Sequence, residues 1–354
     1  MALDATPSSI ALQRPDDALV AAWSALAARP GVPPFARPGW VMPWARAFGH
    51  DLRLLTVRGV DGLAAALPLV GARSLSTAAD WHVPEASALW ADDAAAGALA
   101  DALTALDTPH ITLDFVPDAS PTHRVLGGAL AAAGWRIHTR ERARSPYVDL
   151  SVGWEAYRDG LSGKKLRELR RRMRRLEGEG AVEFTVHDGI EGLDPLLDEG
   201  LAVEAAGWKG ETGTAIAADP AVELFYREVA AWAAGEGMLR LQFLRLDGRA
   251  IAFDLALVSG GREWLLKTGF DPELRRHAPG QHLRLFALRS AFERGLDAYE
   301  FAGSADPWKL EWTAATRPVL AVEAFAPGPA GMAALVRLRG GRALRALRSR
   351  LTPG

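Results

Sequence analysis

The chain has 354 residues, 49% of them hydrophobic, and a formal net charge of −2. This length predicts two domains, because one core rarely grows past about 250–300 residues, and the near-neutral charge singles out no partner. The absence of cysteine excludes disulfides, thiolate metal sites and cysteine nucleophiles. The N-terminus lacks a basic segment followed by an apolar one, and no run of about 18 apolar residues occurs, so we expect neither signal peptide nor membrane span.

The first half of the chain alternates helical and strand patterns. Apolar periodicity predicts helices at Asp16–Ala28, Trp40–Phe48, Ala94–Leu106 and Thr122–Ala133. Strands are expected at Leu52–Val57, Leu63–Val70 and Ile111–Val116, within Trp81–Trp90, from Trp135–His138 and at Tyr147–Leu150.

The second half repeats this order of elements. Helices are predicted at Ala156–Leu161, Lys164–Glu177, Leu193–Ala206, Ala221–Ala234 and Leu283–Phe292. Strands are predicted at Val182–His187, Leu239–Leu246, Ile251–Val258, Trp264–Phe270, Ala298–Ala302 and Val319–Ala324. The sequence therefore indicates a mixed α/β (α+β) fold of two tandem halves. We expect domains at 1–150 and 151–328 and a basic amphipathic tail at 329–354.

The stretch Glu263–Arg294 reads as strand, loop and helix, and the chain is organised around it. Its loop holds two prolines, a glycine and the basic residues Arg275, Arg276 and His277. Such a junction points the free backbone N–H groups of a helix N-terminus at the loop, which makes an anion site. The expected anion is the pyrophosphate of a coenzyme A thioester.

Several motifs between Trp154 and Thr316 resemble one known family. They are the Gly207–Gly210 and Gly213–Ile216 segments, the hairpin Leu246–Phe253, the strand end Leu266–Asp271, the loop Ala278–Gly280 and the segment Asp306–Trp312. In this order and spacing the chain resembles the CelD/BcsL-type branch of the GNAT acyltransferases, relatives of the FemABX peptidyltransferases. The resemblance implies two GNAT-like halves, the first degenerate, and a link to bacterial exopolysaccharide and cell-envelope synthesis.

The resemblance implies acyl transfer from acetyl-CoA or another acyl-CoA to an amine. The donor would bind Arg275, Arg276, His277, Gly280, Gln281 and His282. The loop departs from the usual [Q/R]-x-x-G-x-[G/A] pattern. Arg276 and Gly280 keep the order of a basic residue and a glycine, but their spacing differs and His282 replaces the second small residue. Pro279 also removes an N–H donor.

Four residues are candidates for the catalytic chemistry. An amine acceptor needs a base, and Glu204 on a predicted helix is one candidate, with a solvated helix glutamate as the alternative. Asp254 lies in an apolar strand on a face of small residues, which suits a cleft floor or a packed helix. Lys267 faces either the cleft or a strand edge, and Asp306 is an acid, a base or a partner of Lys309.

Trp208, Lys209 and Lys309 are the candidate substrate-binding residues. Trp208 would form the floor under a sugar or pantetheine, or else anchor its own loop. The eight histidines show no metal-ligand spacing, so we predict no metal.

Two segments are strongly basic. The segment Lys164–Arg175 has eight basic residues in twelve, and predicts either a solvated amphipathic helix or a polyanion site. Its ligand would be the coenzyme A 3′-phosphate, a lipid-pyrophosphate-linked sugar, a nucleotide messenger, the inner-membrane surface or tRNA. After Glu323 no acidic residue follows, while six arginines do, which fits either peripheral contact with an anionic membrane or a helix that caps the second domain.

The sequence thus favours a cytoplasmic, acyl-CoA-dependent N-acyltransferase that acts on an amino sugar or related envelope or exopolysaccharide precursor. Direct attack by the amine is expected, because neither a cysteine nor an activated-serine motif is present. One alternative is a FemX-like transferase that uses aminoacyl-tRNA, which would make tRNA a partner. Another is an inactive GNAT-fold protein that binds a nucleotide or a polysaccharide-synthesis partner. The acceptor, the acyl length and the oligomeric state are not specified by the sequence.

Overall fold

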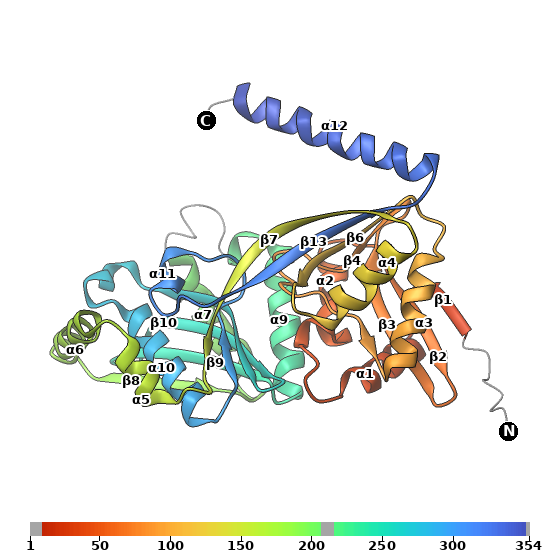
Figure 1. The fold of residues 1–354 in the computed structure, drawn as a ribbon. Helices are drawn as coiled ribbons and strands as arrows, with labels where there is room; N and C mark the ends of the chain where they lie inside the picture. Colours follow the sequence, from red (N-terminus) through yellow and green to blue (C-terminus); the bar gives the residue numbers. More distant parts are fainter. Residues whose placement is uncertain (1–8, 207–215, 352–354) are drawn as a thin grey trace. The chain divides into compact units, whose positions relative to one another are not determined.

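The computed structural model describes residues 9–206 and 216–351 (Figure 1). The chain forms two compact units. The first unit contains Met1–Val41, Gly49–Ala143 and Pro318–Gly354, and the second contains Met42–Phe48 and Arg144–Arg317. Two of the divisions fall inside strands, β7 (Arg136–Asp149) and β13 (Thr316–Phe325). The sequence placed the boundary near residue 150 and assigned 319–328 to the second domain, whereas the structure groups residues 318–354 with the first unit.

The first unit is a mainly antiparallel sheet in the order β1-β2-β3-β4-β6-β13, with β5 beside β3. Its other strands are β1 (Ser9–Gln13), β2 (Leu52–Gly59), β3 (Gly62–Val70), β4 (Ser74–Thr77), β5 (Leu89–Trp90) and β6 (His110–Pro117). The β4–β6 pair is parallel.

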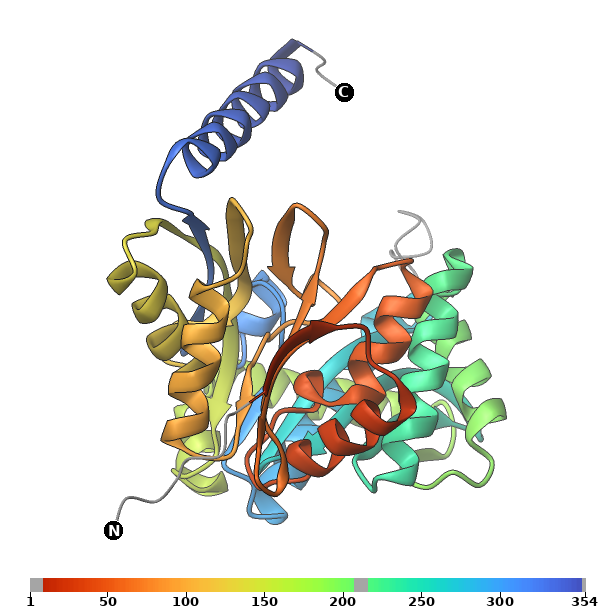
Figure 2. The ribbon, with the colours of Figure 1, turned by 90° about the vertical axis from the view of Figure 1, so that its right-hand side faces the viewer.

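Helices lie on both sides of this sheet. They are α1 (Asp17–Ala27), η1 (Pro34–Ala36), α3 (Asp93–Thr104), η2 (His123–Gly127) and α4 (Gly128–Ala132), and α2 (Pro38–Ala47) spans the division between the units. In Figure 2, α3 in orange and α1 in red flank the strands from opposite sides. Side chains of α3 such as Leu99 and Leu103 pack with Ile111 and Val322 of the sheet in one apolar core. Helix α12 (Pro329–Leu351) ends the described chain.

The second unit is a sheet in the order β7-β12-β11-β10-β9-β8. Its strands are β8 (Val182–His187), β9 (Leu239–Leu246), β10 (Arg249–Ser259), β11 (Arg262–Phe270) and β12 (Ala298–Glu300), and only β11–β12 pairs in parallel among these described strands. Its helices are α5 (Trp154–Gly160), α6 (Gly163–Glu177), α7 (Leu193–Ala206), η3 (Ile216–Ala218), α9 (Pro220–Gly235), η4 (Pro272–His277), α10 (Pro279–Glu293) and α11 (Pro307–Leu310).

Two glycines let helix α7 pack closely on this sheet. A Cβ at Gly200 would lie 2.3 Å from Cε2 of Phe253 in β10, and a Cβ at Gly269 in β11 would lie 2.5 Å from Cα of Glu204. Any larger residue at either position would push helix and strand apart. Gly269 therefore fixes the position of Glu204 on the sheet.

The predicted mixed α/β class is confirmed, and several strand predictions were wrong. The strands predicted at Trp135–His138 and Tyr147–Leu150 are one strand, β7, whose middle carries polar side chains that hid it from an apolar pattern. Within Trp81–Trp90, where a strand was predicted, only Leu89–Trp90 forms one. Strands β1 and β4 were not predicted. The tail helix runs without a break through Gly340 and Gly341. Within residues 9–206 and 216–351, no helix is long and apolar enough to cross a membrane.

Candidate active site

The second unit contains a cavity of about 580 Å³ beside β11, the start of α10 and α11. Six consecutive residues of β11, Leu265–Phe270, form one wall. Five cationic side chains also line the cavity, compared with two carboxylates, so its lining favours an anionic ligand. The five are Arg172, Lys267, Arg275, Arg284 and Lys309, and the two carboxylates are Glu204 and Asp306.

The cavity exists because two parallel strands separate. Strand β12 pairs with β11 only over Arg262–Trp264, after which β11 runs on to Phe270 while β12 ends at Glu300. A bulge at Leu266 shifts the register with β10 on the other side of β11. Within the described chain, no strand pairs with the β12-facing edge of Leu265–Phe270. An unpaired strand edge offers backbone N–H and C=O groups to an extended ligand.

The loop between β11 and α10 supplies part of the cavity mouth. Asp271 caps η4 by accepting a hydrogen bond from Glu273 N at 2.9 Å, and it pairs with Arg249 at 2.6 Å. Ala278, at the start of α10, has a left-handed φ of 54°. Arg275, Gly280 and Gln281, three of the residues predicted to bind the donor, line the cavity. A Cβ at Gly280 would lie 3.3 Å from Cδ1 of Phe270, so this loop approaches the strand closely.

The other three residues predicted in this loop do not line the cavity. Arg276 donates to Glu179 at 2.8 Å, and His277 lies 2.9 Å from the same carboxylate oxygen. His277 and His282 are buried, with 3% and 4% exposure. Burial lowers the pKa of His282 to about 4, so its ring is neutral at pH 7. These three residues support the loop and the start of α10 without lining the cavity.

A buried ion pair lies under the cavity floor. Arg284 of α10 donates to Oδ1 of Asp254 at 2.8 Å, and both residues are 1% exposed. Arg284 also donates to the hydroxyl of Tyr299 and, at 3.4 Å, to Thr268 Oγ1. Arg284 lines the cavity, whereas Asp254 lies behind it. Asp254 therefore orients a cation of the floor, since its side chain does not reach the cavity.

Glu204 and Lys267 reach the cavity from α7 and β11. Glu204 is 1% exposed, and its Oε2 accepts a hydrogen bond from Ile216 N at 2.9 Å. The Lys267 ammonium lies 4.7 Å from the centre of the Tyr226 ring, a cation–π contact. Trp208 and Lys209, the predicted acceptor-binding residues, lie outside the described residues.

Lys309 binds its own loop. Its ammonium donates to the carbonyl oxygens of Ala302 and Ser304 and pairs with Asp306, each at 2.9 Å. These three acceptors match the three donors of an ammonium group. Ala302 has a left-handed φ of 52°, a conformation that this clamp holds. Lys309 and Asp306 thus shape the cavity wall as a pair.

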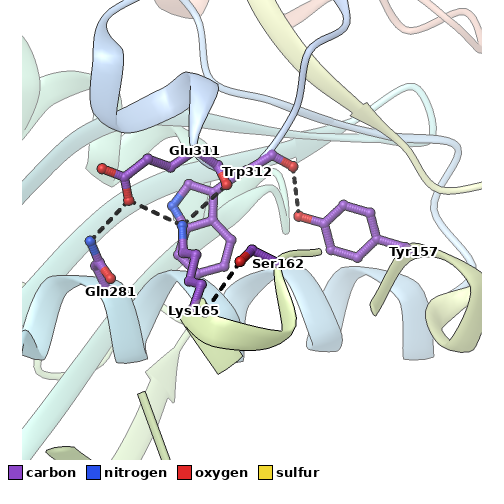
Figure 3. Close-up of polar contacts among 6 residues, drawn as sticks. All are labelled: Tyr157, Ser162, Lys165, Gln281, Glu311 and Trp312. Atoms are coloured by element: carbon purple, nitrogen blue, oxygen red, sulfur yellow. Dashed lines mark hydrogen bonds and ion pairs between the residues drawn. The ribbon is translucent and has the colours of Figure 1, made fainter. Parts of the chain in front are cut away.

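A further cluster ties the basic helix α6 to the cavity rim (Figure 3). Lys165 donates to both the carbonyl and the carboxylate of Glu311 at 3.2 Å and lies 3.6 Å from the centre of the Trp312 ring. Gln281 donates to the same carboxylate at 3.1 Å. Burial lowers the pKa of Lys165. The sequence missed this role because the partners are over a hundred residues apart.

The rest of α6 follows its predicted pattern. Leu169 and Leu176 are buried, and the exposed residues include Arg167, Arg170 and Arg174. Arg172 lines the cavity and pairs with Glu168 at 2.8 Å. In the described part of the chain, no three histidine or carboxylate side chains come together as metal ligands would.

The comparisons with known proteins concern the segment that holds this separated strand pair and the start of α10. Residues 163–310, from the first residue of α6 to the last of α11, match the acetyltransferase (GNAT) domain family. The second unit therefore has the GNAT acetyltransferase fold. This matched segment holds every cavity-lining residue except Trp312. A search of curated proteins found no match.

Solved structures show the same fold over most of the chain. The C-terminal domain of a putative lysylphosphatidylglycerol synthetase from Agrobacterium fabrum has 15% identity and a TM-score of 0.56, covering 89% of this chain and 94% of its own. FemX has 12% identity and a TM-score of 0.58, covering 86% and 95%. A tandem GNAT protein of the clavulanic acid biosynthesis pathway has 15% identity and a TM-score of 0.50, covering 91% and 100%. The predicted tandem GNAT-like architecture is thus confirmed.

Proposed function

We propose that this protein is an acyl-CoA-dependent N-acyltransferase whose donor binds along the separated edge of β11. The observation that carries this proposal is the cavity wall of six consecutive β11 residues beside a cationic helix start. An extended pantetheine chain would pair with backbone groups along the β12-facing edge of Leu265–Phe270 as a strand does. Its phosphates would lie near Arg275, Gly280 and Gln281, with Arg172 on the facing helix.

The transfer would proceed by direct attack of an amine on the thioester carbonyl. The C–N bond forms, and the carbonyl oxygen carries negative charge in the transition state. The base takes the proton that the amine loses, the C–S bond breaks, and the departing thiolate is protonated to the free thiol. Backbone N–H groups of β11 would stabilise the oxyanion. Glu204 is the base in this proposal, because it lines the cavity while Asp306 is engaged by Lys309.

The acceptor is proposed to be an amino sugar or a related envelope or exopolysaccharide precursor. This assignment rests on the resemblance to the CelD/BcsL-type branch. Lys267 would contact the acceptor from β11, and Trp208 and Lys209 are the further candidates from the sequence. The buried pair of Asp254 and Arg284 would hold the cavity floor in shape rather than touch the reacting atoms.

A second candidate donor is an aminoacyl-tRNA, and the exposed basic face of α6 favours it. Arg167, Arg170 and Arg174 are solvent-exposed on this helix, and such a stripe suits an RNA backbone. Binding of tRNA would then fall steeply with salt and with charge reversal at these three residues.

Thermal unfolding with acetyl-CoA and longer acyl-CoAs tests the donor directly. At 100 times the Kd, a bound thioester should stabilise the protein by about 2.7 kcal/mol. Gly280→Asp places a carboxylate beside Phe270 in the cationic loop and should abolish this shift. Gly97→Asp, at an exposed helix position with open space around its Cβ, is the matched control and should keep it. No stabilisation by any thioester would contradict the acyl-CoA proposal.

A further inference from the structure

Strand β7 carries a row of basic residues that the proposed transferase reaction does not use. Arg136, His138, Arg140 and Arg142 alternate along the strand within the first unit. Alternate side chains of a strand point to the same face. Ile137, between them, packs against the apolar core of the first unit, so the basic residues occupy the opposite face. We call this face, with Trp81, the basic strand surface.

Two of these basic side chains lie beside carboxylates of neighbouring strands. His138 Nδ1 lies 3.5 Å from Glu323 Oε2 of β13, and Arg142 Nε lies 3.5 Å from Asp114 Oδ1 of β6. The two carboxylate side chains are only 5% and 17% exposed, whereas His138 is 47% exposed. The carboxylates are therefore largely covered, whereas the Arg142 side chain is 28% exposed and His138 is about half exposed.

Among the described residues, the other two arginines have no carboxylate within ion-pair distance, although the charge of Arg140 acts on Asp114 from farther away. Neither Arg136 nor Arg140 forms an ion pair with another residue in the described part of the chain. Arg136 is exposed and Arg140 is half-buried. These two guanidinium groups can therefore bind an anionic ligand. A guanidinium donates two parallel hydrogen bonds to a carboxylate, which strengthens such binding.

An exposed aromatic ring lies at one end of this row. Trp81 is 52% exposed, and it packs edge-to-face on Phe115 with ring centres 5.1 Å apart. The guanidinium of Arg142 lies 5.4 Å from the Trp81 ring centre and 4.8 Å from that of Phe115. An indole fixed in this way is a flat platform, suited to the apolar C–H face of a sugar ring.

We propose that the basic strand surface binds an acidic polysaccharide. From Arg136 to Arg142 the strand extends about 20 Å, with a basic side chain roughly every 6.6 Å, which fits a linear polymer with repeated negative charges. A single-stranded nucleic acid would require several aromatic rings for successive bases. Here the basic residues alternate without aromatic residues between them, and Trp81 stands at the end of the row. This proposal is independent of the transferase reaction.

Fluorescence anisotropy with a labelled oligomer of six galacturonate units, at low salt and on the full chain, tests the proposal. The unmodified protein should bind this oligomer, and Arg136→Gln/Arg140→Gln should weaken binding by at least about tenfold. Trp81→Ala should weaken it about threefold or more, since a stacking contact is lost. Arg58→Gln/Arg124→Gln, which removes two exposed arginines elsewhere in the first unit, is the matched control and should leave the affinity within about twofold.

Three comparison ligands decide between ligand classes. A neutral glucan of the same length should not bind, and oligouridylate and inorganic polyphosphate should bind more weakly than the uronate. Equal affinity of the Arg136→Gln/Arg140→Gln variant and the unmodified protein for the uronate would overturn the proposal. Tighter binding of oligouridylate, or equal binding of polyphosphate, would overturn it as well, by indicating a nucleic-acid surface or unspecific charge attraction.

Discussion

Both units contain a parallel strand pair that is bonded over three residues, and they differ in how the space beyond the paired residues is filled. In the second unit, β11 runs on past the end of β12, and its residues beyond that point line a cavity of about 580 Å³. In the first unit, β6 runs on past β4, and the chain itself fills the space. Ala86 N donates to Phe115 O at 2.8 Å, and Thr77 Oγ1 bonds both the N–H and the C=O of Asp114 at 2.8 Å.

The difference lies in which groups satisfy the backbone of the longer strand. The cavity beside Thr77 and Ala86 measures only about 10 Å³, about the space that a single water requires. Buried N–H and C=O groups need partners, which come either from the protein or from a ligand. The first unit supplies its own partners, and the second leaves a site.

Breaking the buried Arg284–Asp254 ion pair of the second unit should have the largest effect on stability. Asp254→Ala leaves the guanidinium of Arg284 buried and uncompensated, which should cost about 3–5 kcal/mol of unfolding free energy. Urea unfolding measures this loss. The matched control is Glu293→Ala, which breaks the exposed Arg289–Glu293 pair (2.7 Å) and should cost about 0.3–0.5 kcal/mol. A loss under 1 kcal/mol for Asp254→Ala would show that the floor does not depend on this pair.

The second unit should also be sensitive to acid at the start of α10. The pKa of His282 is about 4 in the folded protein, below its ordinary value of 6.5. Because the unfolded chain binds this proton more readily, stability falls as pH decreases from about 6.5 to 4, by on the order of 3 kcal/mol.

The protection factors of the α10 amides, which compare their exchange with that of the unfolded chain at the same pH, should decrease over this pH range. The variant His282→Gln should not show this decrease. The amides of α3 in the first unit serve as the internal reference. If the protection factors of α10 decreased equally with glutamine at position 282, another group would be responsible for the loss of stability.

Removing a hydrogen-bond partner of β6 in the first unit should have a smaller effect. Thr77→Val leaves the N–H of Asp114 without its hydroxyl partner, which should cost about 1–3 kcal/mol. Thr104→Val, at an exposed hydroxyl on α3, should stay within about 0.5 kcal/mol. Neither change should alter the affinity for an acyl-CoA. A large loss of donor affinity in Thr77→Val would indicate that the donor binds in the first unit, which contradicts the proposal.

Much of the fold followed from apolar periodicity, as the continuous apolar run of β10 illustrates. Strand β7 did not, because five basic residues alternate from Arg136 to Arg144 on its outer face. Alternation of charged residues is itself a strand signal of period two, and it would have located the basic strand surface.

The cavity lining was predicted in part. The anion loop and Glu204 could be proposed from local sequence because helix starts and glycine turns are local features. The pairing of Asp306 with Lys309 was one of the alternatives that the sequence offered. The bond from Lys309 to Ala302 O and the pairing of Lys165 with Glu311 were not proposed, since they depend on how the chain folds. His282 looked like a loop ligand in the sequence, and its burial became visible only with α10 in place.

Amide hydrogen exchange with saturating acetyl-CoA tests the contrast between the two strand pairs most directly. Our account predicts new protection at Leu265–Phe270 and at the start of α10, with no change over Ser74–Thr77 and His110–Pro117. Unchanged exchange along β11, or protection confined to β4 and β6, would contradict it.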